Sequence, residues 1–212
     1  MSQDYLSQDF FARGAEAKLY DSSLLGSPVL IKERTAKRYR TASLDKSIRK
    51  SRAKNESRIM LKALAAGINV PKILSVGKFN IYMEKLQGKR LREAKLSKID
   101  KKKIFKEIGR ILSDMHAAGI THGDFTPANI MLCRNKIYLI DFGLAALSNE
   151  LEEKAVDVLL MEKNISNKEF SYFLIGYKKN KEWKKVLNRT QEIKKRGRYQ
   201  IRAEENIEEK DE

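Results

Sequence analysis

The chain carries the octapeptide HGDFTPAN at residues 122–129 and the tripeptide DFG at residues 141–143. Asn129 follows Asp124 by five residues and precedes Asp141 by twelve. Kinase-type sites place a base and two magnesium ligands in this order, as a loop Asp, an Asn and the Asp of a DFG turn. Magnesium takes oxygen ligands but only one or two carboxylates from protein. The spacing therefore predicts Asn129 and Asp141 as metal ligands, Asp124 as the base, and phosphoryl transfer from ATP as the reaction class.

Two short apolar runs separate the predicted metal ligands. The first reads IML from residue 130 and the second reads IYLI from residue 137, with Arg134-Asn135-Lys136 between them. Apolar runs joined by a tight turn predict a β-hairpin, which would bring Asp141 back beside Asn129, as a shared metal requires. This context favours the kinase interpretation over the alternative that these side chains are ordinary turn and capping residues.

Two upstream segments predict the remaining parts of such a site. The pentapeptide PVLIK forms a short apolar strand ending in Lys32, where kinase-type sites place a phosphate-binding lysine. Apolar residues at helical spacing over 44–66 predict a helix that Ser43 caps and Gly67 ends. Glu56 falls within the apolar stripe of this helix, where an unpaired charge is costly, so we expect it to pair with Lys32. The open alternative is that Glu56 lies at the edge of the stripe and reaches water.

Composition limits the class of protein. The 212 residues suffice for one domain or two closely packed lobes, and they include only three prolines and a single cysteine, Cys133, which excludes an internal disulfide. The sequence shows no apolar run of eighteen residues and no hydrophobic signal region, so we expect no membrane insertion or secretion and a cytoplasmic location. His122 has no partner at metal spacing, and we expect it to pack and hydrogen-bond within its loop.

Element patterns predict an α+β fold of two lobes. We expect a β-rich N-terminal lobe over 1–84 with one long helix, a helical C-terminal lobe over 85–200, and an acidic tail over 201–212. The lobe boundary lies in the connector that begins at Glu84. The expected strands are near 17–20, 29–32, 73–76 and 80–83, and the expected C-terminal helices are one from Asp100 to Gly119 and others near 150–162, 167–176 and 181–196.

The net charge of +16 is concentrated in two segments. Residues 32–62 contain twelve basic residues against three acidic ones, and residues 178–202 contain eleven against two. A charge run is usually a solvated helix face, but an excess of this size is typical of a protein that binds a polyanion. The acidic tail could fray in solvent or fold back on the basic segment before it.

The chain resembles the small protein-kinase-like ATPase subunit of the KEOPS (EKC) complex, which supports threonylcarbamoylation of tRNA adenosine. The likeness covers nearly the whole chain. The segments that carry it include GAEA at 14–17 in place of a full Gly-rich loop, IKER at 31–34, HGDFTPAN, DFGLA at 141–145, AVDVLLME at 155–162 and the basic tail with RGR at 196–198.

Several residue roles follow from the resemblance. It implies that Lys32 holds phosphates and pairs with Glu56, that Gly14 and Ala15 cover the nucleotide, and that Glu84 and Leu86 offer backbone groups to adenine. It assigns Asp124 as base and Asn129 and Asp141 as magnesium ligands. Asp157 resembles an aspartate that braces the catalytic loop from a following helix, although a surface position is the open alternative. The residues expected to contact tRNA are those of the tail that follows the last expected helix, namely Lys194, Lys195, Arg196 and Arg198.

The chain departs from ordinary protein kinases in two ways. Gly14 stands alone where three glycines would cover the phosphates, and no APE tripeptide follows the DFG turn. With a reduced C-terminal lobe, the resemblance implies ATP hydrolysis in support of a metal-dependent threonylcarbamoyl-transferring subunit and other KEOPS subunits, with protein phosphorylation incidental. Phosphate-contacting Lys and Arg would suit tRNA.

Three other classes remain open. A small-molecule phosphotransferase of the aminoglycoside or choline kinase type would need a larger, more acidic C-terminal lobe. A ribosome-associated kinase of the RIO type would share the compact plan, and copurification with ribosomal subunits or with KEOPS proteins would separate the two. A nucleotide-sensing or tRNA-binding module without turnover is disfavoured, because all five expected catalytic groups are present: Lys32, Glu56, Asp124, Asn129 and Asp141.

Overall fold

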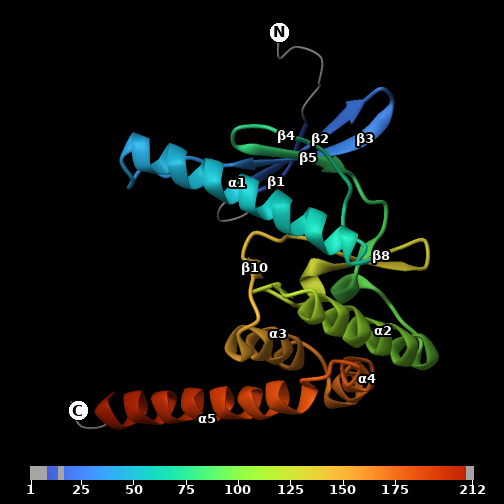
Figure 1. The fold of residues 1–212 in the computed structure, drawn as a ribbon, viewed down its shortest axis with the longest axis vertical. Coiled ribbons are helices and arrows are strands. Elements are labelled where there is room, and N and C mark those ends of the chain that lie inside the picture. Colours follow the sequence, from blue (N-terminus) through green and yellow to red (C-terminus); the bar gives the residue numbers. More distant parts are fainter. Residues whose placement is uncertain (1–8, 14–16, 209–212) are drawn as a thin grey trace. The chain divides into compact units, whose positions relative to one another are not determined.

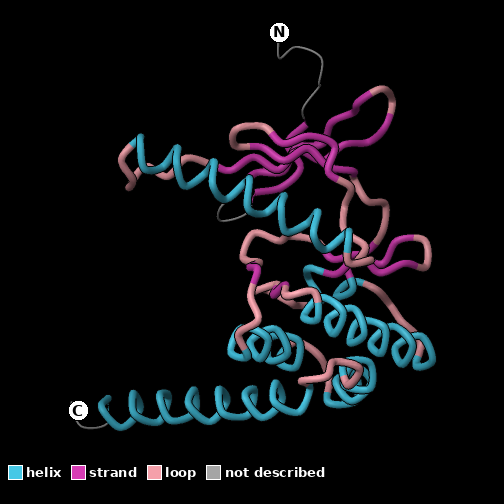
Figure 2. The backbone as a smooth tube through the Cα atoms, in the orientation of Figure 1, coloured by secondary structure: helices cyan, strands magenta, loops and turns pink. Residues whose placement is uncertain are grey.

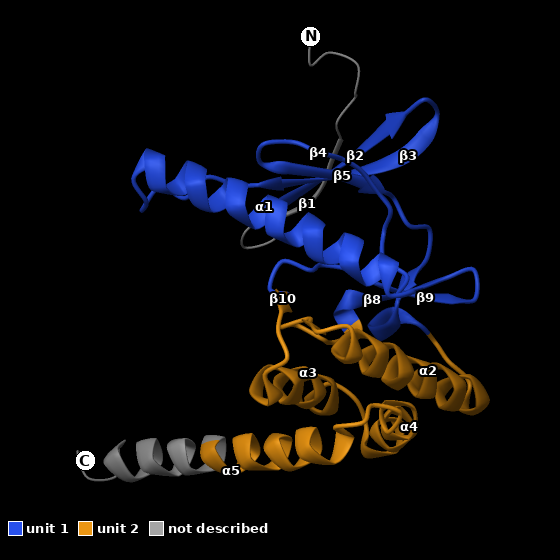
Figure 3. Ribbon diagram, in the orientation of Figure 1, with its two compact units in different colours: residues 1–94, 128–145 blue, residues 95–127, 146–212 orange. Residues whose placement is uncertain are grey.

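The computed structural model describes residues 9–13 and 17–208, with side chains described for 17–196. The chain divides into two compact units, coloured separately in Figure 3: residues 1–94 with 128–145 form unit 1, and residues 95–127 with 146–212 form unit 2. The hairpin that carries the DFG turn, which we assigned by sequence to the C-terminal lobe, thus belongs to unit 1.

Unit 1 is built on a five-stranded antiparallel sheet in the order β1-β2-β3-β5-β4, with a long helix packed against β4 and β5 (Figure 1). A second sheet of three short strands has the order β6-β8-β9. The elements of unit 1 are β1 (Asp9–Arg13), β2 (Ala17–Leu24), β3 (Ser27–Arg34), α1 (Ala42–Ala65), β4 (Ile73–Val76), β5 (Asn80–Glu84), β6 (Lys89–Arg90), the 3-10 turn η1 (Leu91–Glu93), β8 (Ile130–Cys133) and β9 (Lys136–Leu139).

The sheet and helix follow from the sequence pattern, with one correction. The central strand β3 pairs with β2 on one side and β5 on the other, and its apolar residues Val29 and Ile31 are 1% exposed. The helix α1 begins two residues earlier than expected. Its N-cap is Thr41, whose backbone oxygen accepts the first helical bond from Asp45 N–H at 2.9 Å, so Ser43 already lies inside the helix and the predicted Ser43 cap is wrong.

Unit 2 is mainly helical, as Figure 2 shows. It contains α2 (Lys98–Ala117), α3 (Leu151–Lys163), α4 (Asn167–Tyr177) and α5 (Trp183–Glu208), together with β7 (Ile120–Thr121), which pairs with β10 (Ala146–Leu147). The 3-10 turn η2 (Pro127–Asn129) lies where the chain passes from unit 2 to unit 1.

Two glycines allow α2 and α4 to pack at very short range. A Cβ atom built on Gly109 would lie 1.9 Å from the backbone oxygen of Phe173, and one on Gly176 would lie 1.9 Å from the backbone oxygen of Lys106. No side chain fits at either position. The contact places Tyr177, the neighbour of Gly176, inside the core of unit 2 with no exposed surface.

The last helix differs most from the expectation. We predicted that it ends near Arg196 and that the basic tail follows it, but α5 continues through Gly197 to Glu208. A single glycine costs a helix only about 1 kcal/mol relative to alanine, and good helix formers follow it in the sequence. The basic residues 194–198 and the first part of the acidic tail are therefore helical, and residues 209–212 lie outside the described part.

Candidate active site

The predicted lysine–glutamate pair forms within unit 1. Lys32 Nζ lies 2.5 Å from Glu56 Oε1 and 2.8 Å from Asp141 Oδ1. The side chains of Lys32 and Glu56 are 9% and 2% exposed, whereas that of Asp141 is 56% exposed. Glu56 therefore does not reach water. The pairing joins the central strand, the long helix and the DFG turn through one ammonium group.

Sequence reasoning missed a fourth member of this cluster, Arg34. Its guanidinium donates to Glu56 Oε2, so that each oxygen of Glu56 binds a different cation. Arg34 also lies against the DFG turn, because a Cβ atom built on Gly143 would be 3.2 Å from Arg34 Nη2. The signal was its position two residues after Lys32, since alternate residues of a strand face the same side of a sheet.

The hairpin between the two predicted metal ligands is present. Strand β8 pairs with β9 in the register Ile130↔Leu139, and Ile140 N–H donates to the backbone oxygen of Asn129 at 3.0 Å. Arg134 and Asn135 both have positive φ, as a tight two-residue turn between right-twisted strands requires. The hairpin therefore returns the chain to Asn129 one residue before Asp141.

Asp141 has an unusual backbone conformation. Its φ is +61°, in the left-handed region that is uncommon for residues other than glycine, and its Oδ1 accepts from Gly143 N–H at 3.2 Å. Such outliers concentrate at functional sites. The two predicted ligands, the exposed carboxylate of Asp141 and the side-chain amide oxygen of Asn129, are oxygen donors of the type that suits magnesium held mainly by phosphates and water. The described residues contain no group of three or more His, Cys, Asp or Glu side chains that is arranged to hold a metal ion.

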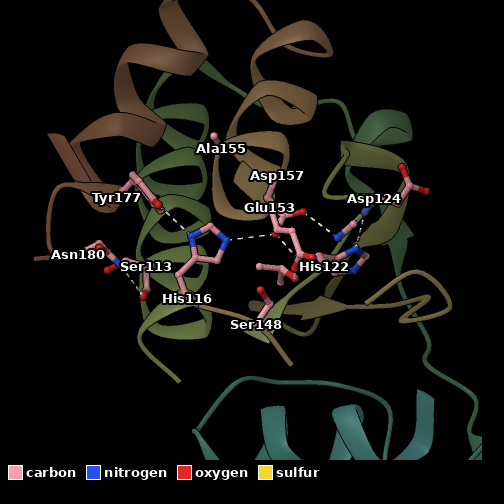
Figure 4. A network of polar contacts seen from close by, with 12 residues as sticks. Ser113, His116, His122, Asp124, Ser148, Glu153, Ala155, Asp157, Tyr177 and Asn180 are labelled. Carbon is pink, nitrogen blue, oxygen red and sulfur yellow. Dashed lines mark hydrogen bonds and ion pairs between the residues drawn. The ribbon is translucent and has the colours of Figure 1, made fainter. Parts of the chain in front are cut away.

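The loop that contains Asp124 belongs to unit 2 and is held by Asp157 of α3. Asp157 is fully buried and accepts from the backbone N–H of His122 through Oδ2 and from that of Gly123 through Oδ1, both at 2.8 Å (Figure 4). The surface position left open for Asp157 is therefore excluded. Two charge-assisted bonds of this kind, each contributing about 1.5–3 kcal/mol, fix the backbone immediately before Asp124.

His122 packs within the same loop, as predicted. It has no exposed surface, its Nδ1 accepts from Asp124 N–H at 3.3 Å, and its ring meets the Phe125 ring edge to face at 5.8 Å. The imidazole thus takes part in shaping the turn that leads into Asp124.

A buried network extends from Asp157 to two residues that sequence reasoning did not single out. His116 of α2 lies with Nε2 3.1 Å from Asp157 Oδ2 and Nδ1 2.8 Å from the hydroxyl of Tyr177 on α4 (Figure 4). Because a carboxylate can only accept, Nε2 of His116 is assigned the hydrogen, and Nδ1 then accepts from the Tyr177 hydroxyl.

Burial sets the protonation states of this network. It lowers the pKa of His116, against the opposing effect of Asp157, and it raises the pKa of Tyr177 far above the ordinary value. A neutral imidazole that donates to the carboxylate and accepts from the phenol satisfies each of these contacts. His116 and Tyr177 lie 61 positions apart in the chain, and no pattern in a single sequence links them.

The structure describes some of the other residues that were predicted to contact the nucleotide. Glu84 ends β5, where its backbone N–H donates to the Lys72 oxygen at 2.9 Å, so Glu84 would contribute its carbonyl to a nucleotide. Leu86 follows in the connector. Gly14 and Ala15 lie outside the described residues.

The residues predicted to contact tRNA lie on α5, and two of them form ion pairs within the chain. Lys194 pairs with Glu162, and Arg196 lies 3.1 Å from Glu152. Both acids belong to α3, against which α5 packs. Lys195 is exposed, and the side chain of Arg198 lies outside the described part.

The sheet with its long helix, the lysine–glutamate pair and the DFG hairpin define a protein-kinase-like fold, and solved structures agree. The Rio2 kinase–ADP/Mg2+–phosphoaspartate complex from Chaetomium thermophilum matches with a TM-score of 0.64 at 14% identity, over 86% of this chain and 65% of that one. WaaP in complex with acyl carrier protein matches with a TM-score of 0.63 at 15% identity, over 86% of this chain and 83% of that one. At such identities the likeness concerns the fold alone.

Sequence comparisons define the family more closely. The model of the RIO domain matches residues 18–181. The KEOPS complex subunit Bud32 of Pyrococcus abyssi is 34% identical over 90% of this chain and 96% of its own length. The chain therefore belongs to the Bud32 family of RIO-domain proteins. A probable bifunctional tRNA threonylcarbamoyladenosine biosynthesis protein of Methanothermobacter thermautotrophicus is also 34% identical over 92% of this chain, which spans only 37% of that protein's length. In the described part of the chain, no helix is long and apolar enough to cross a membrane.

Proposed function

We propose that this chain is a Mg-ATP-dependent ATPase and atypical serine/threonine kinase that supports tRNA N6-threonylcarbamoyladenosine modification within a KEOPS complex. The observation that carries the proposal is the ion pair of Lys32 with Glu56 beside Asp141 of the DFG turn, because a kinase site requires a Lys–Glu pair and a DFG aspartate. The assignment to KEOPS draws on the names of the relatives from Pyrococcus abyssi and Methanothermobacter thermautotrophicus.

The proposed mechanism begins with Lys32. Its ammonium group binds the carboxylates of Glu56 and Asp141. In the proposed complex with nucleotide, Lys32 would keep Glu56 and contact phosphate oxygens. Asp141 and Asn129 would hold the magnesium ion. Magnesium, when bound, would neutralise charge that develops on the phosphates.

Asp124 would act as the base. It would accept the proton of the attacking water or hydroxyl, and Asp157 would hold its loop in position through the backbone of His122 and Gly123. The backbone of Glu84 and Leu86 would orient the adenine. A single glycine at Gly14 and the absence of an APE tripeptide favour water over a protein hydroxyl as the main acceptor.

The proposed partners are the metal-dependent threonylcarbamoyl-transferring subunit, other KEOPS subunits and tRNA. ATP consumption should be measured for the chain alone, with tRNA, and with these proteins. We expect turnover to rise when the partners are added. Copurification with ribosomal subunits in place of KEOPS proteins would favour a ribosome-associated RIO kinase.

Two substitutions test the assigned roles. Asp141→Asn should abolish turnover and weaken Mg-ATP binding, because it removes the main charge that faces the metal. Asp124→Ala should lower turnover by about 10²–10⁴-fold and leave nucleotide binding intact. An Asp124 variant with near wild-type turnover would exclude this residue as the base.

A further inference from the structure

One face of α1 carries five basic residues at intervals of four. They are Lys46, Lys50, Lys54, Arg58 and Lys62, and all five side chains are exposed. Residues four apart are neighbours on the helix surface, and each step advances about 6 Å along the axis, so that the five span about 24 Å. We call this row the α1 basic ridge.

No carboxylate of α1 compensates the ridge. The helix contains two acids, Asp45 and Glu56, and both are buried and already paired, Asp45 with Arg49 at 2.7 Å and Glu56 with Lys32 and Arg34. Within the described residues no ion pair involves a ridge side chain, and the polar contact that is present joins Arg58 to the neutral Asn55 at 3.1 Å. Like charges four residues apart destabilise a helix, so the ridge opposes the folding of α1.

Elsewhere some surface cations are paired within the chain. Arg110 of α2 binds Glu107 and Asp114 within its own helix. Arg189 of α5 binds Glu192 within its helix and an acid of α3 besides. On α2 the exposed Lys98, Lys102 and Lys106 also lie four residues apart, without an ion pair among the described residues, but this row ends at the paired Arg110. The row on α1 is longer, and a ligand of opposite charge outside the chain would compensate it.

We propose that the α1 basic ridge binds the phosphate backbone of tRNA, which rests on the proposed function for the identity of the RNA. A nucleic-acid duplex presents about one negative charge per 1.7 Å of axis, so a row of cations that advances about 24 Å while turning about 160° around the exposed side of the helix meets several phosphates. Lysine binds phosphate as a point charge without reading bases. A membrane is disfavoured because the apolar face of α1, with Ala53, Ile59 and Met60, is buried within unit 1.

The test is a double charge reversal on α1 that should weaken RNA binding and at the same time stabilise the helix. In Lys50→Glu/Arg58→Glu, every step of the ridge joins opposite charges, which supports an isolated helix. The matched control is Lys102→Glu/Lys106→Glu on α2, where both side chains are exposed and the change in net charge is the same. Full-length proteins are compared by their affinity for an unmodified tRNA transcript at several salt concentrations, by thermal unfolding, and by ATP turnover without RNA.

We expect the ridge variant to bind tRNA at least about tenfold more weakly at moderate salt, and to lower the slope of log affinity against log salt by about two, one for each lost phosphate contact. Its unfolding temperature should not fall, and its ATP turnover without RNA should match that of the wild type. The control variant should keep wild-type affinity within about twofold. Should the ridge variant unfold, Lys50→Gln/Arg58→Gln provides the same comparison with a slope lowered by the same amount.

Several results would overturn the proposal. Unchanged affinity and slope in the ridge variant would do so, as would an equal loss in the control, which would indicate net charge alone. A ridge that instead governs binding to phosphatidylserine vesicles would reassign it to a membrane. Failure of the proposed function is distinguishable: wild-type protein that binds tRNA through the ridge but never consumes ATP removes the ATPase and leaves the ridge, whereas normal ATP consumption with ridge-independent tRNA binding removes the ridge alone.

Discussion

Glu56 neutralises two buried cations at once, and its replacement should therefore destabilise the protein more than replacement of either cation. In Glu56→Gln, the guanidinium of Arg34 loses the carboxylate of Glu56, and Lys32 keeps the half-exposed carboxylate of Asp141. In Lys32→Met, Glu56 remains paired with Arg34. In Arg34→Met, Glu56 remains paired with Lys32.

The magnitudes follow from these differences. Removing one partner of a buried ion pair costs about 3–5 kcal/mol, since the buried charge that remains is less well compensated. Losing one hydrogen bond to a charged group that retains another partner costs about 1.5–3 kcal/mol. We therefore expect Glu56→Gln to lower the free energy of unfolding by about 3–5 kcal/mol, and each methionine variant by about half of that. The free energy of unfolding of a native domain is only about 5–15 kcal/mol in total.

Urea unfolding measures these changes in the free energy of unfolding. The position of the single tryptophan allows the unfolding of unit 2 to be followed by fluorescence. Trp183 lies in unit 2, so its fluorescence reports on that unit, while circular dichroism also reports on the α1 helix of unit 1. The control is the triple variant Lys32→Met/Arg34→Met/Glu56→Met. Replacing a whole buried ionic cluster by apolar side chains is often neutral for stability, so this variant should fold and yet consume no ATP. Equal losses for Glu56→Gln and Lys32→Met would refute the shared role of Glu56.

Three further predictions concern unit 2. Because burial keeps His116 neutral, the unfolded chain gains a proton below pH about 6.5 that the folded chain does not. The free energy of unfolding should therefore fall below that pH, by at most about 1.4 kcal/mol per pH unit for this group, and a urea series in His116→Gln should show a shallower fall. Asp157→Asn puts a donor amide against the N–H groups of the Asp124 loop, and should lower kcat about 10²-fold while leaving KM for ATP near the wild-type value, in steady-state assays; an unchanged kcat would contradict the bracing role. Lys195→Gln/Arg198→Gln on α5 should lower the salt dependence of tRNA binding by up to about two units of slope, and unchanged titrations would remove these residues from the interface.

Much of the fold and site was predictable because the signals are local. The spacing of Asp124, Asn129 and Asp141 identified the chemistry, since short loops and hairpins hold groups at separations that depend mainly on the residues between them. The apolar runs on either side of Arg134 and Asn135 predicted the hairpin through turn geometry alone. Helical periodicity located α1 and placed Glu56 on its buried face.

Errors arose where local signals compete. Ser43 is a good capping residue, but Thr41 two positions earlier begins the helix, and sequence patterns leave such ends uncertain by a few residues. The last helix was expected to end near Arg196, but the penalty of about 1 kcal/mol for Gly197 is smaller than the gain from continuing the helix through the residues after it. The helix α5 therefore runs to Glu208.

The sequence by itself determined the class of chemistry and the family, because motif residues close together in the chain act through local geometry. The tertiary structure decided the distant contacts beyond the predicted Lys32–Glu56 pair. That Glu56 binds Arg34 as well as Lys32, and that His116 joins Asp157 to Tyr177, depends on how strands and helices pack. Long-range pairing of this kind is set by the burial of whole elements, and local sequence patterns such as strand alternation at Arg34 give only a weak signal of it.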